Sequence, residues 1–160
     1  MNDLNKTDVL RRSVLGTELD EAEAQVLTER MGVVSLHDGE TLVCEGEARR
    51  TLVLLAQGGI AVGKIVGPSE ETVYQMRPGE CAGTRAFVDG SQRKAALRSI
   101  GDSTVLTLEP EAFETLLDTH PRIVYKVMRA IFRITHTNLM HANLDSAELR
   151  NYLMRGGRRY

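Results

Sequence analysis

The sequence predicts a mainly β fold with flanking helices: an antiparallel β-barrel or jelly roll with N-terminal helices and a long C-terminal helix. Two observations lead to this prediction. Short apolar runs separated by glycine turns fill the middle of the chain, which is typical of antiparallel β-structure. Apolar residues at helical spacing mark both ends. A length of 160 residues suits one domain with an appended helix.

Two short helices are predicted within residues 1–32. Apolar residues in 8–15 suit the first of them. The second can be capped by Thr17 or by Asp20, and Gly32 ends it in the usual way. The apolar residues of this second helix recur near helical spacing: Leu19, Ala22, Val26, Leu27 and Met31.

Residues 33–108 are predicted to form the barrel, because the pattern changes here from helical spacing to short apolar runs. Glycine-containing turns separate the runs, including one at Gln57-Gly58-Gly59. The predicted strands are 33–36, 41–44, 51–56, 60–66, 72–76, 94–100 and 103–108.

The stretch 79–95 inside the barrel is suited to a phosphate. Gly83 opens a helix-competent run, a polar loop follows, and Arg93-Lys94-Ala95 then enters a strand. This order places a helix N-terminus, free backbone N–H groups and an arginine around one concavity. A ligand-binding role is therefore the first hypothesis to test.

A hinge and C-terminal helices are predicted over 109–155. Pro110 suits the first turn of a short helix, and His120-Pro121 ends it. A longer helix follows, with an interruption expected at 143–146, a last short helix at 147–154 and a disordered tail at 156–160. One side of the long helix is a wide apolar stripe: Ile123, Val124, Val127, Met128, Ile131, Phe132 and Ile134. This stripe can pack on the barrel, pair with a second copy of the chain, or do both.

Charge is distributed unevenly along the chain. Residues 1–118 hold 12 Lys and Arg against 20 Asp and Glu, whereas residues 119–160 hold 8 against 2. The basic C-terminal part can meet nucleic acid, an acidic partner or the acidic body of the same chain, or it can simply form a solvated helix face.

Several classes of function are not expected. No apolar run approaches the roughly 20 residues that span a bilayer, and no secretory signal is visible, so we expect a cytoplasmic protein without a membrane segment. Cys44 and Cys81 lack metal-binding or redox spacing and are expected to be reduced thiols. The four histidines do not cluster with acids or cysteines, and no catalytic triad or carboxylate pair stands out. We expect neither a metal site nor an enzyme.

This plan resembles the cyclic nucleotide-binding domain family over roughly residues 9–138. The family's first signature is matched by 39–47, by the apolar run 52–55 and by Gly58, although Arg49 stands where the family prefers a small residue. The run 113–121 looks like the family's connection to its C-terminal helix.

The resemblance identifies 79–95 as a phosphate-binding cassette. In the family a Gly-Glu pair begins the cassette helix, and an arginine, a small residue and an alanine end the loop. Gly83, Arg93 and Ala95 match this pattern. Thr84 replaces the glutamate that holds the ribose 2′-hydroxyl, and Lys94 replaces the small residue.

The resemblance further implies that Arg93 and the N–H groups around Thr84, Arg85 and Ala86 hold the cyclic phosphate. A hydroxyl in place of a charged acceptor weakens ribose recognition by roughly 1.5–3 kcal/mol. If Arg85 and Lys94 face the site, their charge favours a more anionic ligand, such as cyclic di-GMP, over cyclic AMP or cyclic GMP. The alternatives are that both residues face solvent, and that the cassette is degenerate and binds no ligand.

Asn138 is the residue that the resemblance aligns with a base-contacting position on the long helix, with Thr135 and Thr137 close by. An asparagine offers both a donor and an acceptor to a purine edge. The alternative is that these polar residues lie on a solvated or dimer-facing helix surface.

The predicted function is that of a non-catalytic bacterial sensor, which binds a cyclic mono- or dinucleotide and signals through the helix 122–140 to a dimer mate or another protein partner. About twenty residues follow Asn138, too few for the winged helix-turn-helix domain of related transcription factors, so sequence-specific DNA binding is not expected. The competing hypotheses are a ligand-free interaction adaptor and nucleic-acid binding by the basic tail.

Overall fold

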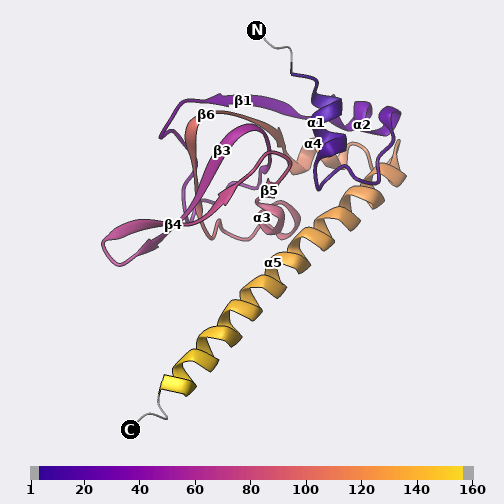
Figure 1. Ribbon diagram of the computed structural model, residues 1–160. Helices are drawn as coiled ribbons and strands as arrows, with labels where there is room; N and C mark the ends of the chain where they lie inside the picture. Colours follow the sequence, from indigo (N-terminus) through magenta and orange to yellow (C-terminus); the bar gives the residue numbers. More distant parts are fainter. Residues whose placement is uncertain (1–3, 157–160) are drawn as a thin grey trace.

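The computed structural model describes the backbone of residues 4–156 and the side chains of residues 4–138 (Figure 1). The elements, in chain order, are α1 (Lys6–Arg12), α2 (Glu21–Thr28), β1 (Gly32–Leu36), β2 (Thr41–Val43), β3 (Leu52–Val66), β4 (Ser69–Met76), β5 (Cys81–Ala82), α3 (Thr84–Asp89), β6 (Ala96–Leu108), α4 (Pro110–Glu114) and α5 (Pro121–Gly156). In Figure 1, α1, α2 and α4 gather at one end of the sheet. Helix α5 begins there and runs obliquely past α3.

The strands form one antiparallel sheet in the order β1-β6-β3-β4, with β2 also paired to β6 and β5 to β3. This arrangement confirms the predicted mainly β fold with flanking helices and a long C-terminal helix. Among the described residues, no helix is long and apolar enough to cross a membrane.

Two predicted strand breaks are wrong. Strand β3 runs without interruption over 15 residues, and β6 over 13. The turn expected at Gln57-Gly58-Gly59 is instead a pair of register shifts in the β3–β6 ladder. Gly58 has φ +88° and lies so close to β6 that a Cβ would be 2.4 Å from the Asp102 carbonyl oxygen. A glycine here bends the strand without ending it, because pairing with β6 resumes on both sides.

The N-terminal helices begin where a side chain satisfies free N–H groups. The Asn5 side chain accepts from the Asp8 amide, so α1 starts at Lys6. Asp20, rather than Thr17, caps α2 and forms a reciprocal capping box with Glu23.

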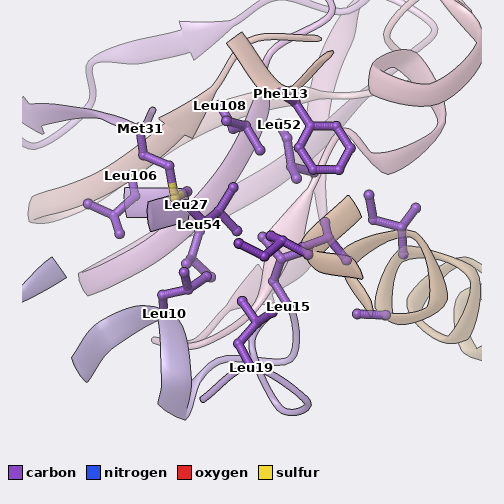
Figure 2. Close-up of a cluster of buried hydrophobic side chains, with 14 of the residues drawn as sticks. Leu10, Leu15, Leu19, Leu27, Met31, Leu52, Leu54, Leu106, Leu108 and Phe113 are labelled. Carbon is purple, nitrogen blue, oxygen red and sulfur yellow. The ribbon is translucent and has the colours of Figure 1, made fainter. Parts of the chain in front are cut away.

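The core has two parts, and β3 forms the wall between them. Along this strand Leu52 and Leu54 face a cluster that includes residues of the helices, whereas Val53 and Leu55 face a cluster inside the barrel. The alternation is that of a strand buried on both faces. Figure 2 shows the first cluster, in which Leu10, Leu27 and Phe113 meet residues of β3 and β6. The fold therefore links the barrel directly to the helices.

Helix α5 is continuous over 36 residues. The interruption predicted at 143–146 and the separate helix at 147–154 are therefore wrong. That stretch contains neither glycine nor proline, and its polar residues cost the helix less than about 0.7 kcal/mol each. Gly156, the first residue of the predicted disordered tail, is the last residue of α5, and 157–160 lie outside the described residues.

The apolar stripe of α5 is narrower than predicted. Ile123, Val127 and Ile131 are buried in the core as expected, together with Ala130. Phe132, which the stripe included, is 70% exposed. Helix α5 thus has one face on the domain and a second apolar surface facing outward.

The basic side chains of α5 meet acids from the N-terminal helices and their connection. Lys126 pairs with Glu23 at 2.7 Å, and Glu18 receives both Arg129 at 3.5 Å and Arg133 at 2.9 Å. Of the roles predicted for the basic segment, contact with the acidic body of the same chain is the one that these pairs support.

Glu18 makes the attachment of α5 sensitive to acid. A hydrogen bond from Arg133 is the main reason why the pKa of Glu18 lies below its usual 4.5. A lowered carboxylate pKa adds stability that is present above the unfolded pKa and lost as pH falls through the folded value. We expect Glu18→Gln to reduce the loss of stability in acid, measured by urea unfolding at about pH 6 and pH 3. An unchanged pH dependence in the variant would contradict this assignment.

Candidate functional site

Arg93 is the central residue of the candidate site. Its backbone is fixed by two hydrogen bonds to the loop before β3, from Arg93 N to Glu47 O at 3.0 Å and from Gly46 N to Arg93 O at 2.8 Å. Its side chain is 6% exposed, and Nη2 donates to the carbonyl oxygen of Thr51. Nε is buried without a hydrogen-bond partner among the residues that the structure describes. The site therefore contains a buried cation with one donor that no described residue uses.

Gly83 forms one wall around this guanidinium. It caps the start of α3 with φ +84°, a conformation that residues with a Cβ rarely adopt. A Cβ here would lie 1.8 Å from Arg93 Nη1 and 2.9 Å from the Thr51 carbonyl oxygen. Only glycine fits both the backbone conformation and the space at this position.

Helix α3 is held at its far end by Arg50. Its Nε donates to Ala86 O at 3.3 Å, and its Nη2 donates to Phe87 O at 3.3 Å and Val88 O at 3.5 Å. These carbonyls belong to the last turn of a short helix, where backbone partners run out; Ala86 O also accepts from the Gly90 amide at 3.0 Å. Arg50 thus fixes the cassette helix from the connection before β3, a role that sequence reasoning missed.

The other predicted site residues separate into buried and exposed ones. Thr84 and Ala86 are buried, and Ala95 is half-buried. Lys94 is exposed, and Arg85, also exposed, pairs with Asp89 at 3.6 Å along α3. The structure therefore favours the alternative in which Arg85 and Lys94 face solvent.

Thr84 connects the cassette to α5. Its hydroxyl lies 3.1 Å from that of Thr135, within hydrogen-bond distance. Asn138, three residues further along α5, is exposed. Of the two, Thr135 is thus the residue that the structure brings to the cassette.

Thr51 is a second residue that sequence reasoning missed. It is 1% exposed and lies immediately before β3. Its Oγ1 donates to Glu109 Oε1 at 2.6 Å and accepts from Arg49 Nε at 3.1 Å, while its carbonyl accepts from Arg93. The sequence did offer a signal for Thr51. It is a polar residue that stands directly between Arg49-Arg50 and the apolar run 52–55.

The electrostatics of the site favour an anion. Burial is the main cause that lowers the pKa of Arg93, and the neighbouring Arg49 acts in the same direction. Glu47 and Glu109 oppose the shift. A buried guanidinium is costly unless charge or hydrogen bonds compensate it, so an anion that reaches it is stabilised.

An aromatic contact ties the cassette to the segment that precedes α5. The ring of Phe87 in α3 packs on that of Phe113 in α4, with centroids 5.4 Å apart. Both residues are buried in the core cluster next to the helices. A displacement of α3 therefore has a direct packing route to α4.

Cys81 in β5 is expected to be unreactive, although it lies within the cassette 79–95. The two thiols are free, as predicted, and burial raises the pKa of Cys81 to about 12. Because the thiolate is the nucleophile, we expect the exposed Cys44 to react first with an aromatic disulfide reagent at neutral pH. Mass spectrometry of the singly labelled protein checks this, and preferential labelling of Cys81 would contradict it.

The family model described as cyclic nucleotide-binding domain matches residues 33–120. A comparison with curated proteins finds no match to this chain.

Three solved structures of similar fold come from bacteria. The N-terminal domain of a transcriptional regulator from Streptomyces coelicolor A3(2) aligns with TM-score 0.74 and 24% identity over 84% of this chain and 95% of its own. A cyclic nucleotide-binding domain from Methylobacillus flagellatus KT aligns with TM-score 0.76 and 19% identity, over 85% and 77%. The Thermus thermophilus catabolite activator protein aligns with TM-score 0.77 and 22% identity, over 86% and 63%.

Proposed function

The chain belongs to the cyclic nucleotide-binding domain family, and from this membership we propose that it is a non-catalytic sensor that holds the phosphate of a cyclic nucleotide on Arg93. One observation carries the proposal. The guanidinium of Arg93 is buried beside Gly83, and its Nε is unpartnered among the described residues. A buried donor without a partner costs about 1–3 kcal/mol, which a phosphate oxygen at Nε offsets.

The remaining cassette residues shape the site around that contact. Gly83 lets the guanidinium of Arg93 lie against the start of α3, and the backbone N–H groups there are proposed as further donors. Asn138, exposed on α5, is proposed to contact the base only if α5 moves toward the ligand.

The second candidate ligand is cyclic di-GMP. Thr84 brings no carboxylate to the ribose, and its hydroxyl is already shared with Thr135. Lys94 follows Arg93 and faces solvent, so it contacts a second phosphate only if its side chain turns toward the site. The missing carboxylate at Thr84 favours a ligand that depends more on phosphate than on ribose.

Output is proposed to pass through α5 to a second copy of the chain or to another protein. Tyr125 and Phe132 are 58% and 70% exposed on this helix. Arg129 lies over the Tyr125 ring at 5.5 Å, and Phe132 stacks on His136 at 6.0 Å. Aromatic and arginine side chains of this kind are enriched at interface hot spots.

Thermal unfolding with cyclic AMP, cyclic GMP and cyclic di-GMP tests the proposal. A ligand at 100 times its Kd stabilises the fold by about 2.7 kcal/mol, which raises the Tm by about 5–10 °C for a chain of this size. We expect this rise with at least one of the three, and we expect Arg93→Ala to abolish it.

Arg98→Ala is the matched control, because Arg98 is an exposed arginine on β6 that pairs with Glu70 at 3.3 Å. This variant should keep the ligand-induced rise. If no ligand raises the Tm of the wild-type protein, the sensor proposal is wrong and the ligand-free adaptor becomes the better account.

A further inference from the structure

We propose that Thr51 is a positioning residue that couples Arg93 to α4, so that capture of a phosphate by Arg93 changes how the start of α4 is held. The coupling is inferred from the contacts of Thr51 alone. Its role in signalling a bound ligand rests on the proposed function. Thr51 contacts Arg93 through its carbonyl oxygen and Glu109 through its hydroxyl.

The first step is the contact between Arg93 and Thr51. The carbonyl of Thr51 accepts Nη2 of Arg93, while Nε of the same guanidinium has no partner among the described residues. A phosphate at Nε competes for the orientation of one planar group, because the donors of a guanidinium have fixed mutual geometry. Ligand capture therefore loosens or redirects the bond to Thr51.

The second step is the contact between Thr51 and Glu109. Thr51 is 1% exposed, so its peptide group and side chain cannot adjust independently in the packed interior. Its Oγ1 donates to Glu109 Oε1 at 2.6 Å. A change at the carbonyl therefore reaches the hydroxyl and alters this bond.

The third step is the position of Glu109 at the start of α4. Glu109 is the N-cap residue of that helix, yet its side chain makes no capping hydrogen bond there. The carboxylate binds Thr51 instead. Once released, it can approach the N–H groups of Glu111 and Ala112, since Pro110 has none and the Phe113 amide already donates to Glu109 O. Glu109 thus has two alternative partners, and Thr51 decides between them.

Arg49 sets the balance between these alternatives. Its Nε donates to Thr51 Oγ1 at 3.1 Å and its Nη1 to Leu42 O at 3.0 Å, so it holds the hydroxyl in place. The positive charge of Arg49 also lowers the pKa of Arg93. The network of Arg49, Thr51 and Glu109 is formed by side chains, so substitutions at these positions can test it.

Hydrogen exchange of the peptide that covers residues 109–117 tests the coupling without a ligand. Arg93→Met removes the bond to Thr51, with Arg93→Leu as a second variant without a donor should the first fold poorly. We expect either change to alter the exchange rate by about two- to tenfold, the range that one net hydrogen bond gives. The same change made in Thr51→Val, which keeps the shape but lacks the hydroxyl, should have a clearly smaller effect, because only the packing of Phe87 on Phe113 then links α3 to α4. In Thr51→Ser, which keeps the hydroxyl, the effect should return.

The coupling is overturned if the Arg93 substitution changes the exchange rate of 109–117 equally in the wild-type and Thr51→Val backgrounds. It is also overturned if the substitution leaves that rate unchanged in the wild-type background. Cyclic AMP provides a separate arm. With the coupling intact, it should alter exchange over 83–93 to the same extent in the wild type and in Thr51→Val. It should alter exchange over 109–117 more in the wild type than in Thr51→Val. If cyclic AMP alters the exchange of neither segment in the wild type, cyclic AMP is not the ligand. The exchange measured for the Arg93 variants without ligand then still decides the role of Thr51.

Discussion

Phe113→Ala is expected to destabilise the protein by about 3–5 kcal/mol, the range for removing a buried phenylalanine. Phe113 is 5% exposed, packs on Phe87 and lies in the core cluster of Figure 2. Its loss leaves a cavity where the barrel, α3 and α4 meet. Urea unfolding followed by circular dichroism measures the difference in free energy of unfolding.

Phe132→Ala is the matched control for this prediction. The same side chain is removed from a position that is 70% exposed, so we expect a change within about 0.5 kcal/mol for the monomer. A comparable loss in both variants would contradict the placement of Phe113 in the core. A large loss for Phe132→Ala alone, dependent on protein concentration, would indicate that α5 is buried in a dimer.

Gly83→Ala is expected to abolish ligand binding and to destabilise the fold by about 1–3 kcal/mol from backbone strain, with the steric clash in addition. The backbone of Gly83 has φ +84°, and a Cβ would overlap Arg93 Nη1 at 1.8 Å. The guanidinium must then leave its position beneath α3. Calorimetric titration with the ligand that stabilises the wild-type protein measures the loss of binding.

Gly39→Ala separates the two causes. Gly39 has nearly the same backbone, with φ +80°, but no atom lies within 4 Å of its Cβ position. We expect it to lose stability through strain alone and to bind the ligand as the wild type does. Equal binding by Gly83→Ala and the wild type would show that the space around Arg93 does not shape the site.

Much of the fold follows from local signals in the sequence. Helix starts at Asp20 and Pro110 depend on neighbouring residues and are visible in the pattern. The continuity of β3 through Gly58 is not visible in the sequence pattern, because it depends on pairing with the distant strand β6 on both sides of the bulge. The exposure of Phe132 likewise depends on which face of α5 meets the domain, and apolar spacing alone cannot fix that face.

The candidate site was predictable only in part, for a similar reason. Arg93 and Gly83 fall in a recognisable local pattern, and the structure brings them together. The partners of Thr51 are Glu109 and Arg93, which are 58 and 42 residues away in the chain. Thr84 meets Thr135 across 51 residues. Such pairs arise from the packing of distant elements, and no pattern in a single sequence shows them.

The most direct test of a phosphate on Arg93 is the NMR signal of its Nε–H group. The signal can be assigned by its absence in Arg93→Lys, and followed while cyclic AMP, cyclic GMP or cyclic di-GMP is added. We predict that the ligand that binds shifts this proton strongly downfield, because Nε gains a charge-assisted hydrogen bond that it lacks among the described residues. An Nε–H signal that stays in place while a ligand saturates the protein would contradict the assignment of Arg93 as the phosphate-binding residue.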